Sequence, residues 1–317
     1  MKGLRALVTN PFFIAWLVAI AASFYVLSRG PEFELGDNLL QLALFGVILP
    51  LIAWLALWPA TSLIVCAHPG KGEMLALLAY VIALSIYLAF GPQTIDAILP
   101  QAWVTAPHLH FFVKLALKLI VFVALPFAIF GRPFGYGWRD FGLQWRGLRE
   151  AARTHLPVIL VISIAMLAFQ YFSGNAAAPL RNGTVTTRQL VLGLPLTFIW
   201  LAIEAGLVEE FFFRGLLQAR LSAWFKSEVT GVVLMSLAFG LAHAPGFIFR
   251  NAGEVEGLGA NPSALQAIAY AIATLSIIGV LFGVIWARTK NLFALILIHA
   301  AIDLLPNVTS FVKTWNL

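Results

Sequence analysis

Long apolar runs recur along almost the whole sequence, and they constrain its fold more than any other feature. A transmembrane helix needs about 20 apolar residues. Hydrophobic residues make up 61% of the chain and charged residues 11%, whereas an ordinary soluble domain has roughly 25% charged residues. We interpret the following runs as spans: 11–28, 39–67, 72–90, 111–131, 157–173, 190–224, 229–249, 264–287 and 291–309. The sequence therefore predicts an all-α, polytopic transmembrane helical bundle with about nine spans.

The charge of the chain fits membrane topology better than nucleic-acid binding. The net charge is +6 and the pI is about 9.7, but no basic surface interleaved with aromatic residues exists outside the spans, so we predict no nucleic-acid partner. Most loop lysines and arginines fall on one side of the membrane when the amino terminus is cytoplasmic, as the positive-inside rule requires. We expect an integral membrane protein whose partners include the lipid bilayer.

Four regions differ in their charge and hydrophobicity. Residues 1–131 form transmembrane segments with almost no embedded acid, and we assign them an accessory or substrate-docking role. Residues 132–155 mix aromatic residues with five arginines, which predicts a basic amphipathic cytoplasmic segment lying on anionic lipid. Residues 156–310 carry the embedded ionisable groups and are predicted to be the catalytic membrane core. Residues 311–317 are expected to form a tail.

Two adjacent carboxylates and an arginine lie within one apolar run, as Glu209, Glu210 and Arg214. Each acid or base at the centre of a transmembrane helix costs roughly 2.5–3.5 kcal/mol, so such groups need internal partners or water. On a regular helix Glu210 and Arg214 are i, i+4 and can form an ion pair. Glu209 points about 100° away from Glu210, and a carboxylate in an apolar pocket can serve as a general base. The alternative is that all three form a structural network that fixes helix packing.

Two later spans carry further ionisable groups at membrane depth. The first contains His243, and the last contains His299 and Asp303. A single embedded histidine is at least as often a packing group as a catalytic one. Three spans that each place ionisable groups at depth are most simply explained by one shared, water-filled pocket.

Three motifs occur in order along these spans: Glu-Glu-x-x-x-Arg at 209–214, Phe-x-x-x-His at 239–243 and His-x-x-x-Asp at 299–303. Together they resemble the CAAX protease and bacteriocin-processing family, also called the Abi family, which contains glutamic intramembrane endopeptidases. The resemblance covers roughly residues 155–310. It implies a protease that hydrolyses a peptide bond in a membrane-associated substrate without a cofactor.

The resemblance also implies roles for individual residues. Glu209 is similar to the general base that activates water, and His243 to the second group that holds this water. His299 and Asp303 are similar to the pair that stabilises the oxyanion. Three supporting residues complete the predicted site: Glu210, Arg214 and Phe239.

Asp303 departs from the family pattern, which often has asparagine at this position. An ionised aspartate cannot donate a hydrogen bond to an oxyanion. Asp303 must therefore be protonated, or it must accept a bond from His299 and keep that imidazole oriented as a donor. We favour the orienting role.

Two other classes of function remain open. Two histidines and a glutamate could hold zinc as three protein ligands plus a water, although the chain has no His-Glu-x-x-His helix. A proton-coupled transporter or a non-catalytic immunity scaffold would also use embedded Glu and His, but transporters commonly show matching repeats, and here the ionisable groups are confined to the carboxyl-terminal half.

The resemblance sets the expected setting of the enzyme. We expect a membrane-anchored protein or peptide as substrate, for example a bacteriocin or a peptide leader, and a prokaryotic cytoplasmic (inner) membrane as location. The predicted topology places the site nearer the cytoplasmic half of the membrane. The sequence carries no signal for oligomeric state.

Overall fold

The computed structural model describes residues 7–30, 33–57, 69–249, 257–258 and 262–317, and the regular structure in these ranges is helical throughout. Helix α2 (Pro11–Leu27) is the shortest of nine apolar helical segments in the described residues. The other eight are long and apolar enough to span a membrane: Leu35–Ala56, Lys71–Ile98, Pro107–Phe134, Trp145–Ser173, Thr187–Phe225, Glu228–Phe249, Ala264–Thr289 and Leu292–Trp315. Each predicted span overlaps one of these segments, although residues 58–67 of the predicted span 39–67 lie outside the described residues. The overlap confirms the predicted all-α polytopic bundle.

The chain forms two compact units, and each combines an early with a late part of the sequence. The first unit comprises Met1–Thr94 and Phe213–Lys290, and the second comprises Ile95–Phe212 and Asn291–Leu317. These limits do not coincide with the domain boundaries expected at 132, 156 and 311. The assignment of residues 1–131 as an accessory region stays a prediction.

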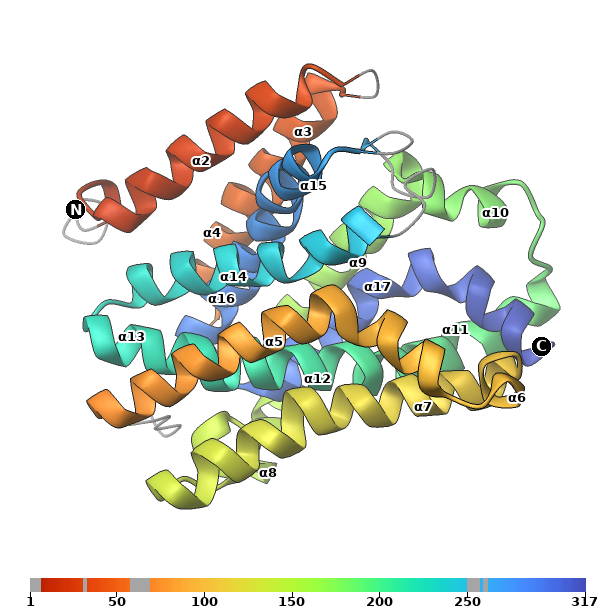
Figure 1. Cartoon of the computed structure of the whole chain (residues 1–317). Coiled ribbons are helices and arrows are strands. Elements are labelled where there is room, and N and C mark those ends of the chain that lie inside the picture. The colour runs from red at the N-terminus through yellow and green to blue at the C-terminus, as the bar shows by residue number, and fades with distance from the viewer. Residues whose placement is uncertain (1–6, 31–32, 58–68, 250–256, 259–261) are drawn as a thin grey trace. The chain divides into compact units, whose positions relative to one another are not determined.

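In the first unit, α14 (Glu228–Phe249) packs along α16 (Ser276–Thr289), and α4 (Leu49–Ala56) contacts the same helix (Figure 1). The first turn of α5 (Lys71–Ile98) carries Glu73, which is 2% exposed and lies 3.1 Å from Nε of the fully buried Arg220. The expectation that the early spans hold almost no embedded acid therefore missed one residue. The acid is embedded because an arginine more than 140 residues later neutralises it.

In the second unit, α17 (Leu292–Trp315) contacts α9 (Leu156–Ser173), α11 (Thr187–Leu201) and the π-helix η8 (Ala202–Leu207) (Figure 1). Gly206 allows the close approach of η8, because a Cβ atom there would lie 2.9 Å from the carbonyl oxygen of Ile296. Helix α17 continues to Trp315, with Phe311 and Val312 buried. Most of the predicted tail at 311–317 is thus the end of a packed helix.

The segment 132–155 is partly exposed and partly packed. Its five arginines are all exposed, as an interfacial segment requires. Phe141, however, is fully buried and stacks on Phe211 with ring centroids 4.9 Å apart, and Trp138 stacks on Phe127 at 3.7 Å. Some of its aromatic side chains therefore pack against protein, because helices of the same unit offer aromatic partners.

Candidate active site

The segment that carries both glutamates is not a regular α-helix. Glu209 and Glu210 lie in α12 (Val208–Glu210), one short α-helical stretch between η8 and a second π-helix, η9 (Phe211–Gln218), which contains Arg214. A π-helix has i→i+5 hydrogen bonds in place of i→i+4, and such insertions are frequent at functional sites. The regular α-helical spacing from which we predicted a Glu210–Arg214 pair is interrupted here, and the pair itself stays a prediction.

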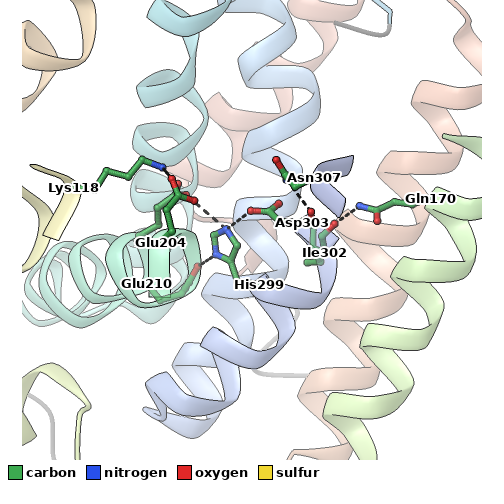
Figure 2. Close-up of polar contacts among 9 residues, drawn as sticks. Lys118, Gln170, Glu204, Glu210, His299, Ile302, Asp303 and Asn307 are labelled. Atoms are coloured by element: carbon green, nitrogen blue, oxygen red, sulfur yellow. Dashed lines mark hydrogen bonds and ion pairs between the residues drawn. The ribbon is translucent and has the colours of Figure 1, made fainter. Parts of the chain in front are cut away.

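His299 lies among three carboxylates of the second unit. Its Nδ1 atom is 2.6 Å from Oε1 of Glu210, and its Nε2 atom is 3.4 Å from Oδ2 of Asp303. The same Nε2 atom is 3.8 Å from Oε2 of Glu209. Figure 2 shows the imidazole of His299 between Glu210 and Asp303. The structure thus brings Glu209, Glu210, His299 and Asp303 together.

The four side chains differ in their exposure, so the imidazole of His299 has a buried side, at Glu210, and a more exposed side, at Glu209 and Asp303, which we call the open side. Glu210 is 0% exposed and His299 is 5% exposed, whereas Glu209 is 17% and Asp303 is 33% exposed. An ionised carboxylate can only accept hydrogen bonds, so the proton between Glu210 and His299 belongs to Nδ1. The Nε2 atom, which faces the open side, carries a lone pair in the neutral imidazole and a proton in the imidazolium.

A lysine from a different span also reaches this region. Lys118, on α7 (Pro107–Leu119), forms an ion pair with Glu204 of η8 (Figure 2). Its ammonium group also interacts electrostatically with Glu209 and Asp303. Lys118 is not among the site residues predicted from the sequence. Its pairing with Glu204 was missed, because nothing in the sequence places a lysine and a glutamate 86 residues apart side by side.

The other predicted site residues lie together in the first unit. Nδ1 of His243 is 2.8 Å from the carbonyl oxygen of Phe239, one turn earlier on α14. A carbonyl only accepts, so Nδ1 donates and Nε2 of the neutral ring carries the lone pair. The guanidinium of Arg214 lies 4.4 Å from the ring centre of Phe239 and 4.8 Å from that of Phe282. The guanidinium of Arg214 therefore makes cation–π contacts with these two rings.

In the part of the chain that the structure describes, no group of three or more His, Cys, Asp or Glu residues has the arrangement of a metal site. The predicted zinc alternative would need Glu209, His243 and His299 as ligands. His243 belongs to the first unit, whereas Glu209 and His299 belong to the second. The absence of a cofactor stays a prediction.

Residues 191–305 match the family model described as type II CAAX prenyl endopeptidase Rce1-like. The predicted family is confirmed for this part of the chain. The matched range contains all seven predicted site residues, whereas Lys118 lies outside it. No curated protein and no solved structure matches the chain significantly. The chain is therefore an integral membrane protein with a CAAX-protease-like region.

Proposed function

We propose that this protein is a glutamic intramembrane endopeptidase, which hydrolyses a peptide bond in a membrane-associated protein or peptide. The family match and the apolar helices support a membrane protease. One observation carries the mechanism: Glu210 is buried against His299, whereas its neighbour Glu209 is on the open side of the same imidazole. Two adjacent glutamates thus have different surroundings, and only Glu209 is placed to meet a water and a substrate.

In the proposed reaction Glu209 removes a proton from water, and the hydroxide attacks the carbonyl carbon of the scissile bond. The carbonyl oxygen becomes an oxyanion, which accepts a hydrogen bond from Nε2–H of His299. Only the imidazolium carries this proton while Nδ1 donates to Glu210, so the Glu210 carboxylate supplies its counter-charge. When the C–N bond breaks, Glu209 returns its proton to the leaving amine.

Asp303 has a different place in this proposal from the one we favoured from the sequence. Glu210 is at hydrogen-bond distance from His299, whereas Asp303 is 3.4 Å from the nitrogen that faces the open side. We therefore assign the orientation of the imidazole to Glu210. Asp303 would add a second polar group beside the oxyanion, and His243 keeps the water-holding role that the family resemblance implies.

The proposed setting follows the sequence expectation. The enzyme would act without a cofactor in a prokaryotic cytoplasmic membrane, on a substrate such as a peptide leader or a bacteriocin. Comparative proteomics of membranes from cells with the wild-type protein or Glu209→Gln tests this directly. Precursors should accumulate with the variant, and the purified wild-type protein should cleave them. If Glu209→Gln cells show no accumulated precursor and the variant restores every phenotype of a deletion, the protein is not a protease of this type.

A further inference from the structure

A small cavity lies in the second unit, between α7, α11, η8 and α17. Its volume is about 130 Å³, close to that of a cavity of about 150 Å³ that holds benzene. Pockets for whole small-molecule ligands have about 300–1,000 Å³. Phe111, Trp200 and Phe311 provide its apolar wall. The cavity therefore has room for one amino-acid side chain and not for a long hydrocarbon chain.

One polar group in this cavity needs a partner that the protein does not supply. Thr197 is 0% exposed, and among the described residues its Oγ1 atom has no hydrogen-bond partner. A buried hydroxyl without a partner is unfavourable. Since Thr197 lines the cavity, the natural occupant should bring a polar atom with it.

The charges around the cavity favour an anion. Lys114 lies on its wall and forms no ion pair within the described ranges. The carboxylate on the wall, Glu204, is already paired with Lys118. The hydroxyl of Ser310 adds a further donor. A substrate carboxylate in the cavity would thus meet a cation and hydroxyl donors, while the methylene groups of the same substrate side chain would contact the apolar wall.

The cavity lies close to the proposed catalytic residues along α17. Asn307 lines it, and the Nδ2 atom of Asn307 donates to the carbonyl oxygen of Asp303 at 2.8 Å. One helical turn separates them, about 6 Å along the axis, and an extended peptide advances about 3.3 Å per residue. A substrate whose scissile bond lies at Asp303 would reach the cavity with a residue one or two positions away.

We propose that this cavity is a specificity pocket for an acidic side chain, Asp or Glu, within two residues of the scissile bond, with Lys114 binding its carboxylate. The inference rests on the proposed protease function and adds a substrate class to it. Lys114 lies outside the segment that matches the family model, so the preference would belong to this chain and not to the shared core.

The test is photolabelling of the full-length Glu209→Gln protein in lipid nanodiscs, because labelling needs binding but no cleavage. The probes are acetylated pentapeptide amides with a benzophenone residue beside a central Glu, Gln, Leu or Lys. Peptide mapping should place the adduct on residues 107–119, 187–204 or 303–315. We expect the Glu peptide to label these segments about tenfold more than the Gln peptide.

Three variants make the result specific. Lys114→Gln should reduce labelling by the Glu peptide to the level of the Gln peptide, and Lys114→Arg should keep the preference. Lys313→Gln removes an exposed lysine of the same unit that does not line the cavity, and it should change nothing. Unchanged labelling by the Gln peptide shows that a variant is folded.

Equal labelling by the Glu, Gln and Leu peptides would overturn the pocket, and so would a Glu preference that survives Lys114→Gln. Neither result would affect the protease proposal, which is tested by cleavage. Acid-selective labelling combined with no cleavage of any precursor would overturn the protease function and leave a carboxylate-binding pocket.

Discussion

The imidazole of His299 lies 2.6 Å from the carboxylate of Glu210, and both side chains are almost completely buried. This contact joins η8–α12 to α17 and fixes the ring through Nδ1, so that Nε2 faces Asp303 and Glu209. In the proposed mechanism Glu210 therefore positions the imidazole of His299.

Glu210→Gln should lower kcat by up to about 10⁴-fold, the loss seen when the carboxylate that orients a catalytic imidazole becomes an amide, and leave KM almost unchanged. The amide keeps the shape of the side chain but removes the charge that supports the imidazolium. Rate measurements on purified protein with a precursor substrate test this. The matched control is Glu228→Gln, which makes the same change at an exposed carboxylate of the first unit and should retain full activity. Wild-type kcat in Glu210→Gln would contradict the positioning role.

Glu209→Gln should reduce cleavage by about 10²–10⁴, the usual contribution of a general base, while substrate binding persists. The amide cannot accept a proton from water. Binding by photolabelling and cleavage by mass spectrometry, measured on the same preparation, separate the two effects. A transporter or scaffold would keep its function in this variant, so retained function would favour those alternatives.

Asp303→Asn should retain at least about a third of the wild-type rate, because an amide beside Nε2 can donate to an oxyanion. Asp303→Leu has a similar size and no polar atom, and it should lose about 10²-fold or more. Comparing the two rates at saturating substrate tests whether the polar group or the charge matters. Near-total loss of cleavage in the asparagine variant would show that the carboxylate itself is required.

A strong chelator should leave the cleavage rate unchanged, because the proposed mechanism uses protein side chains and water but no metal ion. The control is a zinc-dependent protease treated in the same lipid nanodiscs, which should lose its activity. Loss of activity that added zinc restores would favour the metal alternative, in which Glu209 is a ligand and the lone pair on Nε2 of His243 supplies another.

The sequence was sufficient for the helices and the family but not for the contacts among side chains. Apolar length alone located the nine segments, since a bilayer imposes that length. The pairing of Glu210 with His299, and of Lys118 with Glu204, depends on which helices lie side by side, and helical spacing within one segment holds no such information. The spacing argument for Glu210 and Arg214 assumed a regular helix, whereas π-helical turns interrupt the segment, so this pair stays a prediction.

The buried ion pair between Glu73 and Arg220 should be important for stability. The side chains of Arg220 and Glu73 are 0% and 2% exposed. Removing one partner of a buried ion pair leaves an uncompensated charge, which costs about 3–5 kcal/mol. Glu73→Gln should therefore lower the free energy of unfolding by about this amount, measured by denaturant titration in mixed micelles. The control pair, Lys290 and Glu228, is partly exposed, and Glu228→Gln should change the free energy by about 0–1 kcal/mol. Equal effects of the two substitutions would show that burial does not determine the contribution of these pairs.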